Sequence, residues 1–379
     1  MSTMSRRPEI VVDLAAIRAN VGALRDLVAP DGADVMVVVK ADGYGHGMLE
    51  AATAGRAADA PWLGVATIDE ALRLRAAGDT GRILCWLTVP GDDWAAAIEA
   101  DVDVTAYTTA ELAEIRSAVG DRLARVQLKV DTGLSRGGAT ADHWPDLVQA
   151  ARTGEAEGRW RVTGIWSHFA CSDEPEHPAN DAQEQAFRQA LAGAEQAGLR
   201  PEVRHLANSG GALLRPSSRF DLVRCGIAAY GLDPAPGLSP DIGLRPAMTV
   251  TAPLALTKSV PAGSGVSYGH TWTAPGETRL GLVPIGYGDG VPRHAGNTAE
   301  VWVDGKRHRI RGRICMDQFV VDLDHDDAVA AGEEVVLFGP GASGEPTADD
   351  WARVCGTIHY EIVTRMGGRL RRRYTEGAR

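Results

Sequence analysis

A single lysine stands directly after an apolar run near the start of the chain and directly before a glycine-rich turn. The apolar run covers residues 35–39, Lys40 follows it, and the turn carries Tyr44 among its glycines. An amine at the end of a buried strand is poorly solvated, which lowers its pKa and frees it for reaction with carbonyl groups. Glycines let the backbone approach a ligand closely, and a tyrosine hydroxyl can bind an anion. These residues fit a Schiff-base lysine beside a phosphate, and they fit equally a lysine that only caps a strand in a tight loop.

Short β-branched runs alternate with segments of helical period from about residue 34 to residue 232, and a further helical pattern covers residues 13–28. The pattern Thr67–Glu70 is a capping box, and Gly78 ends the helix that it begins. The predicted strands cover residues 35–39, 62–66, 82–87, 102–106, 125–130, 161–166, 203–206 and 222–225. This alternation predicts an α/β fold with an N-terminal (β/α)8 TIM-type barrel. A doubly wound open sheet is the alternative, but it would need a dinucleotide fingerprint, and none is visible.

The pattern changes after Pro240, where helical periods give way to consecutive strands. These strands are predicted at residues 248–258, 279–284, 299–303, 308–313, 319–323 and 334–338. Asp304-Gly305 is a two-residue hairpin turn, and only residues 347–365 return to helical composition. The sequence therefore predicts two domains, a barrel over residues 1–243 and a C-terminal mainly β domain over residues 244–379.

Polar side chains of types that can take part in catalysis or ligand binding follow several of the predicted barrel strands. Active sites of such barrels form at the C-terminal ends of the strands. The residues in these positions are Lys40, Lys129, Asp131, Arg136, His168, Asn208, Ser209 and Arg224. Taken singly, each has an ordinary explanation, such as a solvated arginine or a packed histidine, but their convergence on one rim predicts a site.

The loops after the seventh and eighth strands have the composition of a phosphate site. They read Ala207-Asn208-Ser209-Gly210-Gly211 and Arg224-Cys225-Gly226-Ile227. Small residues expose backbone N–H groups there, and the serine adds a hydroxyl. A lysine that can form an imine, facing a phosphate cradle, implies pyridoxal 5′-phosphate.

The composition of the chain argues against several classes of binding partner and of site. The net charge of −11 argues against nucleic acid or an anionic membrane as the main partner. The five cysteines are scattered without C-x-x-C spacing, so neither a disulfide framework nor a metal site is predicted. Residues 1–10 lack an apolar segment and no stretch approaches membrane-spanning length, so we expect a cytoplasmic protein. The basic run 369–373 is expected to be a solvated tail.

Nine segments, taken together and in order, resemble the pyridoxal-phosphate-dependent alanine racemases of fold type III over essentially the full chain. They are VVKADGYGHG (38–47), LKVDTGLSRGG (128–138), WSHFA (166–170), HLANSGG (205–211), VRCGIAAYGLDP (223–234), GVSYGH (265–270), PIGYGDGVPR (284–293), RGRICMDQFVVDL (311–323) and TIHYEIVTR (357–365). Any one segment alone could match by chance.

The resemblance implies two bases. Lys40 matches the lysine that carries the cofactor and exchanges the Cα proton of D-alanine, and Tyr268 matches the opposing base for L-alanine. Racemisation takes a proton from one face of a planar carbanion and returns one to the other face, so bases on opposite faces suit it. Without the resemblance, Tyr268 would be a hydroxyl that only forms hydrogen bonds in a β-domain loop.

The resemblance also implies the binding residues. Arg224 matches the arginine that faces the cofactor's pyridine nitrogen, with His168 nearby, and Arg136 matches the residue near the phenolic oxygen and the substrate carboxylate. Lys129 matches a lysine that is carbamylated in many relatives. The backbone amide of Met316 is expected to meet the substrate carboxylate. The remaining cofactor-binding residues, mostly around the phosphate, are Tyr44, Asn208, Ser209, Gly226, Ile227 and Tyr360.

In this family Tyr268 and Met316 reach the active site of the other subunit, so the resemblance implies a homodimer with shared sites. The departures from the family are mild: Ser135 stands where many relatives have glycine, and Cys225 and Cys315 adjoin site residues. None of them removes a group that the chemistry needs.

Three other activities remain open. A racemase of broad specificity, or one that prefers serine, would use the same bases and cofactor. A pyridoxal-phosphate carrier would need only the barrel, so the second domain with Tyr268 argues against it. A decarboxylase on the same plan is disfavoured by the combination of Arg224 with Tyr268. D-alanine supply for peptidoglycan is the default role, and alanine degradation or antibiotic resistance would use the same residues.

Overall fold

The computed structural model describes residues 7–324 and 328–377. The chain forms two compact units. The barrel unit comprises residues 17–43 and 48–244, and the C-terminal unit comprises the described parts of residues 1–16, 44–47 and 245–379. No helix in residues 7–324 and 328–377 has the length and apolar character needed to cross a membrane.

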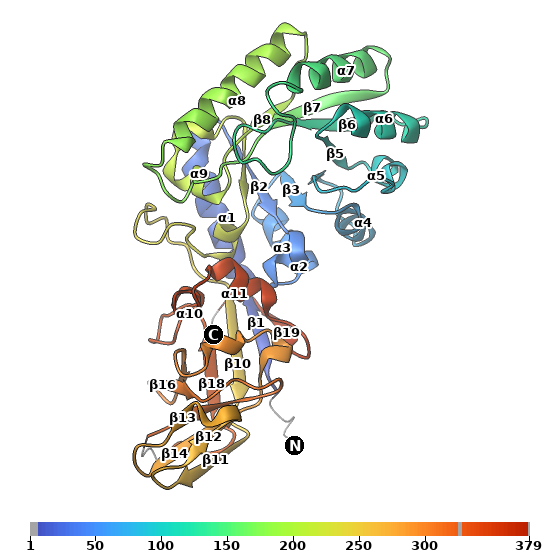
Figure 1. Ribbon diagram of the computed structural model, residues 1–379. Coiled ribbons are helices and arrows are strands. Elements are labelled where there is room, and N and C mark those ends of the chain that lie inside the picture. The colour runs from blue at the N-terminus through green and yellow to red at the C-terminus, as the bar shows by residue number, and fades with distance from the viewer. Residues whose placement is uncertain (1–6, 325–327, 378–379) are drawn as a thin grey trace. The chain divides into compact units, whose positions relative to one another are not determined.

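The barrel unit is an eight-stranded parallel sheet in the order β8-β7-β6-β5-β4-β3-β2-β9, with helices around it (Figure 1). Backbone amides of Asp221 and Arg224 donate to the carbonyls of Arg204 and Ala207, which brings the two ends of the sheet together. The strands are β2 (Asp34–Val38), β3 (Trp62–Val65), β4 (Arg82–Cys85), β5 (Asp103–Ala106), β6 (Ala124–Lys129), β7 (Trp160–Trp166), β8 (Val203–His205) and β9 (Leu222–Cys225). All eight lie where the sequence predicts them, so the (β/α)8 fold class is confirmed.

The helices of this unit include one that begins at the capping box predicted from the sequence. The predicted capping box begins α4, where the Thr67 hydroxyl accepts from the Glu70 amide and the Glu70 carboxylate accepts from the Thr67 amide. Thr108 and Glu111 form an equivalent box at the start of α6. The helices are α1 (Leu14–Val28), α3 (Met48–Ala57), α4 (Ile68–Ala76), α5 (Trp94–Glu99), α6 (Thr109–Ala118), α7 (Trp144–Ala156), α8 (Ala179–Gln196) and α9 (Ser209–Leu214). Short 3₁₀ turns cover residues 29–31, 216–218 and 227–230.

Four neighbouring strands of the barrel sheet contribute to one buried apolar cluster. Met36, Trp62, Leu84 and Leu222, from β2, β3, β4 and β9, form one buried apolar cluster. A barrel of this size is a packed core rather than a channel. The chemistry of the unit is therefore confined to the loops at the ends of its strands.

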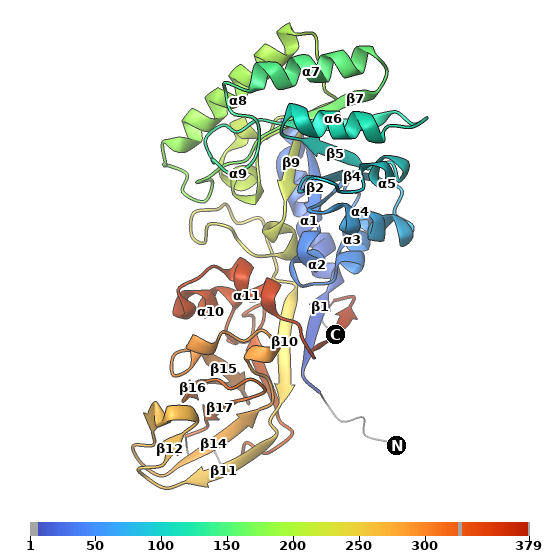
Figure 2. The same cartoon turned by 45° about the vertical axis from the view of Figure 1, so that its right-hand side comes forward.

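The C-terminal unit is built on a nine-stranded sheet in the order β11-β14-β17-β16-β15-β18-β10-β1-β19. Figure 2 labels seven of these strands, namely β1, β10, β11, β14, β15, β16 and β17. Asp304 and Gly305 both have positive φ and connect β15 to β16, as the hairpin prediction requires. Its strands after β1 are β10 (Met248–Pro253), β11 (Leu256–Val260), β12 (Gly265–Val266), β13 (Trp272–Thr273), β14 (Thr278–Val283), β15 (Glu300–Val303), β16 (Lys306–Arg311), β17 (Phe319–Asp322), β18 (Glu334–Phe338) and β19 (Arg371–Thr375). Its helices are α10 (Ala348–Cys355) and α11 (His359–Arg365), with 3₁₀ turns at residues 268–270, 287–289 and 293–295.

The first and last strands of the chain belong together in this unit. Strand β1 (Glu9–Asp13) pairs antiparallel with β10 and parallel with β19. The N-terminal residues therefore lie with the C-terminal sheet and not with the barrel, which differs from the predicted division at residue 243. The difference arises because β1 completes its hydrogen bonding with strands more than 200 residues away.

The prediction of a solvated tail over residues 369–373 is wrong. Arg371–Thr375 form the edge strand β19, and Arg373 pairs with Glu9 at 2.7 Å. Arg369 pairs with Asp289 at 2.8 Å. The basic run is ordered because its backbone extends the sheet and its charges meet carboxylates that are distant in sequence.

Candidate active site

Lys40 begins an unusual left-handed turn at the end of β2. The turn, α2 (Lys40–Tyr44), has φ and ψ of 52° and 49° at Ala41, 54° and 47° at Asp42, and 63° and 42° at Gly43. The amide of Gly43 donates to the carbonyl of Val39 at 2.8 Å and closes the turn. Left-handed non-glycine residues cost roughly 1–2 kcal/mol each, and such strain concentrates at functional sites. The sequence predicts a glycine-rich turn here, but not its hand.

The Lys40 amine lies among cations in a poorly solvated place. Burial lowers the pKa of Lys40, the charges of Arg136 and Arg224 lower it further, and the carboxylate of Glu70 opposes them. The amine also lies 5.8 Å from the centroid of the Trp86 ring. A lysine held in this way offers more neutral amine at ordinary pH than a solvated lysine does.

Arg224, on β9, is buried and donates hydrogen bonds to the segments that follow β7 and β8. Its Nη2 donates to the carbonyl oxygens of Ser167 at 2.7 Å and Leu206 at 3.1 Å. Its Nη1 donates to the carbonyl oxygen of His205 at 3.2 Å. Burial lowers the pKa of Arg224 to about 9, so the guanidinium remains charged at neutral pH.

The same guanidinium sets the protonation of two histidines. It lies 3.0 Å from Nδ1 of His168 and 3.0 Å from Nδ1 of His205. Because a guanidinium only donates, both Nδ1 atoms accept, and the proton of each ring is on Nε2. Nε2 of His205 then donates to Oε1 of Gln127 at 2.7 Å. Burial and the charge of Arg224 lower the pKa of both histidines well below its ordinary value, so both are neutral.

Lys129, the last residue of β6, is a second buried lysine on this rim. Its amine donates to the carbonyl of Gly137 and lies 5.2 Å from the Tyr107 ring and 5.0 Å from the Trp166 ring. Burial, with the charges of Arg224 and Arg136, lowers the pKa of Lys129 to about 8. Lys129 therefore lies in a place that disfavours positive charge.

The loop that carries Arg136 is shaped by a carboxylate and by an unusual backbone angle. Asp131 Oδ1 accepts from the amides of Gly133 at 2.9 Å and Ser135 at 3.1 Å. Ser135 has a φ of 56°, a conformation that glycine adopts with less strain. Arg136 itself is exposed, yet it is close enough to lower the pKa of Lys40 and of Lys129.

Ser209 joins the loops after β8 and β9. The buried Ser209 hydroxyl accepts from the amides of Gly226 at 3.1 Å and Ala228 at 3.4 Å. Asn208 caps α9 by accepting from the Gly211 amide at 3.0 Å, and Ile227 begins the next 3₁₀ turn. The predicted phosphate residues of the barrel unit are thus brought together.

Tyr44 and Tyr360 meet in the C-terminal unit. Their ring centroids are 6.3 Å apart, and the Tyr360 ring stacks on His359 at 5.1 Å. A Cβ on Gly45 would lie 2.4 Å from the carbonyl oxygen of Val363, so this close approach requires glycine. Residues 44 and 45 therefore pack directly on α11 within the C-terminal unit.

Tyr268 and Met316 lie on neighbouring loops of the C-terminal unit. Tyr268 is 69% exposed and Met316 55% exposed in the single chain. The loops are linked by Ser267, whose hydroxyl donates to the Arg313 carbonyl at 2.6 Å and lies 3.4 Å from the Cys315 sulfur. Such exposure of large apolar side chains is typical of residues that contact another chain.

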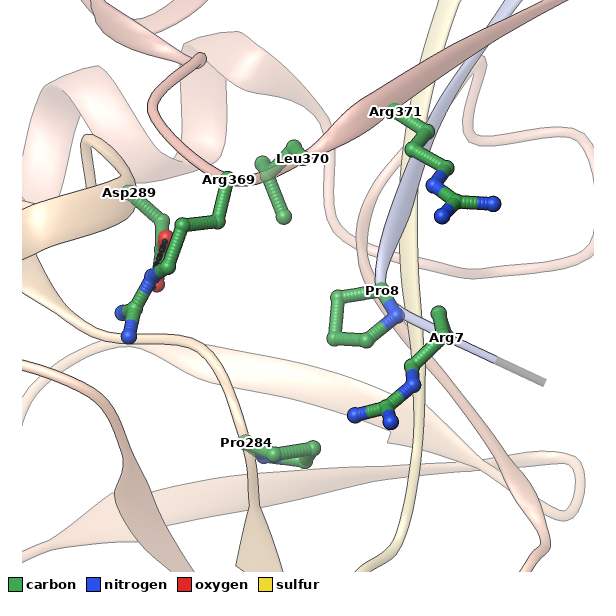
Figure 3. A pocket seen from close by; sticks show the side chains of 7 residues that line it. All are labelled: Arg7, Pro8, Pro284, Asp289, Arg369, Leu370 and Arg371. Atoms are coloured by element: carbon green, nitrogen blue, oxygen red, sulfur yellow. Dashed lines mark hydrogen bonds and ion pairs between the residues drawn. The ribbon is translucent and has the colours of Figure 1, made fainter. Parts of the chain in front are cut away.

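A cavity of about 350 Å³ in the C-terminal unit contains none of the predicted site residues. Its lining is Arg7, Pro8, Pro284, Asp289, Arg369, Leu370 and Arg371 (Figure 3). Arg369 also lies 2.7 Å from Asp317, the neighbour of Met316. This arginine therefore links the cavity wall to the Met316 loop.

Four contacting residues were missed in the sequence. His205 and Gln127 orient Arg224 from inside the barrel, Trp86 covers Lys40, and Glu70 binds the turn after Lys40. The capping box at Thr67–Glu70 was a usable signal, since it placed Glu70 beside a strand end. His205 stands in the segment HLANSGG, but its inward direction follows only from the strand pairing.

Comparison with known proteins agrees with this geometry over both units. The family described as "Alanine racemase, N-terminal domain" matches residues 12–234, and "Alanine racemase, C-terminal domain" matches residues 247–374. An alanine racemase of Streptomyces coelicolor is 57% identical over 378 residues, which cover 97% of this chain and 96% of that protein. One of Thermobifida fusca is 53% identical, over 99% of this chain and 100% of that protein.

The similarity extends to three dimensions. The crystal structure of alanine racemase from D-cycloserine-producing Streptomyces lavendulae superposes with a TM-score of 0.96 at 52% identity, covering 99% of this chain and 98% of that one. The crystal structure of alanine racemase from E. faecalis superposes with a TM-score of 0.90 at 35% identity, covering 98% of both chains. The chain belongs to the alanine racemase family.

Proposed function

We propose that this protein interconverts L-alanine and D-alanine with pyridoxal 5′-phosphate as its cofactor. The observation that carries the proposal is the desolvated amine of Lys40 on the same barrel rim as the charged, hydrogen-bonded guanidinium of Arg224. Family membership supports it over the full chain. We further propose that the barrel binds the cofactor and that residues 244–379 contribute to the site of a second subunit.

The residues of the barrel rim fit this cofactor. A desolvated lysine amine suits its aldehyde, and Lys40 would hold it covalently. Ser209 accepts two amide hydrogen bonds, so its own proton is available for a phosphate oxygen, beside the turn that Gly226 and Ile227 begin. Asn208 orients this loop, and Tyr44 and Tyr360 would complete the phosphate grip. When bound, pyridoxal phosphate makes the Cα–H bond of its amino acid acidic by delocalising the negative charge left behind.

Arg224 is suited to limit that delocalisation. Its hydrogen bonds to Ser167, His168, His205 and Leu206 use Nη1 and Nη2, and no residue in the described part of the chain accepts from its Nε. That N–H would be available as a donor to the cofactor's pyridine nitrogen, whereas a guanidinium would not transfer its proton to that nitrogen as an aspartic acid would. A weaker electron sink disfavours protonation on the cofactor ring, and so favours racemisation over transamination.

Two bases on opposite faces would exchange the Cα proton. Lys40 would take or return it on the D side, and Tyr268 on the L side. Arg136 and the backbone amide of Met316 would hold the substrate carboxylate, which keeps Cα between the bases. His168 stays neutral beside Arg224, so it adds no competing charge.

We propose a homodimer in which Tyr268 and Met316 serve the partner's site. The exposure of both side chains in the single chain supports this. Mixing inactive Lys40→Ala and Tyr268→Ala proteins under conditions of subunit exchange is then expected to restore activity, because each heterodimer keeps one site with both bases. The measurement is racemase activity of heterodimers isolated with two different affinity tags. Isolated heterodimers without activity would contradict shared sites.

We also propose that Lys129 is carbamylated, so that a cation becomes an anion facing Arg136. The neutral amine attacks carbon dioxide, the new N–C bond forms, and one proton is released. Since burial and two arginines lower the pKa of Lys129 to about 8, its neutral fraction rises between pH 7 and 9. The carbamate signal in ¹³C NMR with labelled bicarbonate is expected to rise over the same interval and to be absent in Lys129→Ala. A signal that survives that substitution would place the modification elsewhere.

The deciding experiment incubates the purified protein with pyridoxal phosphate and L-alanine in D₂O. We expect a nearly equal mixture of enantiomers by chiral chromatography, Cα deuteration by NMR, and much slower conversion of L-serine. Exchange without inversion would remove Tyr268 as a base, and loss of the carboxylate would indicate a decarboxylase. We propose further that the protein acts in the cytoplasm and supplies D-alanine for peptidoglycan.

A further inference from the structure

The carboxylate of Glu70, on α4, joins the exits of two neighbouring barrel strands. Its Oε2 accepts from the amides of Ala66 at 2.8 Å and Thr67 at 3.3 Å, which lie at the exit of β3. Its Oε1 accepts from the amide of Ala41 at 2.7 Å, at the exit of β2. One carboxylate oxygen of Glu70 therefore caps the start of α4, and the other binds the backbone amide of Ala41, the residue after Lys40.

The turn held by Glu70 is the strained one. Ala41 and Asp42 are non-glycine residues in the left-handed region, a conformation that persists only where neighbouring groups hold it. Further restraints on the turn include the hydrogen bond from Gly43 to Val39 and the one from the Met48 amide to Asp42 Oδ1 at 3.0 Å. Neither of these touches Ala41. The bond from Ala41 to Glu70 restrains the residue that directly follows Lys40.

We propose that Glu70 is a positioning residue that holds Lys40 in place by anchoring the left-handed turn, which extends the proposed function by naming what orients its lysine base. A second effect follows from charge. The negative charge of Glu70 favours the protonated form of Lys40, whereas burial and the charges of Arg136 and Arg224 disfavour it. Losing Glu70 therefore both frees the turn and leaves the Lys40 amine with less opposing negative charge.

The barrel contains a matched control in its other capping box. Glu111 Oε2 accepts from the amides of Tyr107 at 2.6 Å and Thr108 at 2.8 Å, in the same way that Glu70 binds Ala66 and Thr67. These amide contacts lie at the exit of β5, on the segment that leads into its own helix, α6. The two carboxylates share the capping role, and only Glu70 reaches the turn of Lys40.

The first test measures the Lys40 amine directly. The full-length chain has four lysines, and Lys258 on β11 is exposed, so it serves as an internal reference. Cofactor-stripped protein is labelled with acetic anhydride at a series of pH values and analysed by peptide mass spectrometry. In Glu70→Ala, labelling of Lys40 relative to Lys258 at pH 7 is expected to rise clearly above the wild-type ratio, because loss of the carboxylate lowers the pKa of Lys40 further and raises its neutral fraction. In Glu111→Ala the ratio is expected to stay at the wild-type value.

The second test uses the holoenzyme. We expect Glu70→Ala to lower kcat for D-alanine at least about tenfold with little change in KM, because a misplaced base slows the chemical step without weakening carboxylate binding. The kinetic isotope effect with Cα-deuterated D-alanine should increase. Glu70→Gln keeps one acceptor oxygen and should fall between Glu70→Ala and the wild type.

Thermal unfolding separates positioning from capping. Both alanine variants are expected to lose roughly 2–4 °C in Tm, since each removes one helix cap. Equal losses of kcat in Glu70→Ala and Glu111→Ala, or an unchanged labelling ratio in Glu70→Ala, would overturn the proposal. An altered ratio in a protein that does not racemise alanine would sustain the role of Glu70 and reject the proposed function alone.

Discussion

Lys40→Ala is expected to lower kcat for alanine racemisation by at least about 10⁴-fold, because it removes both a base and the amine that would bind the cofactor. Burial of Lys40 at the end of β2 and the cations around it lower its pKa, which increases the fraction of neutral, reactive amine. The measurement is the initial rate of D-alanine formation from L-alanine, at equal concentrations of folded protein. The visible absorbance of protein-bound pyridoxal phosphate should change at the same time.

Lys258→Ala is the control for this substitution. Lys258 is exposed on β11, so the control removes a lysine of equal charge that has no role in the proposed site. It should retain the wild-type kcat. The barrel fold of Lys40→Ala should be intact by circular dichroism, because the strand before Lys40 keeps its pairing with β3. A Lys40→Ala protein that retains more than a few per cent of the activity would refute the assignment of the base.

Asp103→Asn is expected to lower the free energy of unfolding by about 3–5 kcal/mol, the usual cost of breaking a buried ion pair. Asp103 is fully buried at the start of β5, and its carboxylate binds two arginines from neighbouring strands. Arg82 approaches at 2.7 Å and Arg125 at 2.9 Å, and the Thr163 hydroxyl donates at 2.6 Å. An amide would lose the charge and would place a donor against these donors.

Chemical denaturation of Asp103→Asn beside Asp101→Asn checks this expectation. Asp101 binds the same Arg125, but its side chain is 59% exposed, and exposed pairs contribute about 1 kcal/mol or less. Asparagine also tolerates the left-handed backbone of Asp101. The network lies at the N-terminal end of the barrel strands, where side chains serve stability, so kcat per folded molecule should be unchanged in both variants. A loss below 1 kcal/mol in Asp103→Asn would contradict the reasoning.

Local sequence determined the elements of this protein. The apolar runs that became the eight barrel strands, the Asp304-Gly305 hairpin and the capping box at Thr67 all depend on residues within about ten positions of one another. Periodicity and turn chemistry act over that distance, which is why these predictions are confirmed. The alternation of strands and helices then leaves few topologies, so the positions of Lys40, Lys129 and Arg224 at strand ends also followed from sequence.

The tertiary structure alone decided the contacts that make these residues chemically useful. The four arginines of residues 369–373 resemble a solvated tail until β1 and the carboxylates of Glu9 and Asp289 are brought to them. The left-handed turn after Lys40 is hydrogen-bonded at Ala41 to a carboxylate 29 positions away along the chain. His205 is neutral because it is buried and because the charge of Arg224 reaches it from another strand. Desolvation and charge coupling act between groups that are close in space, and residue order does not encode those distances locally.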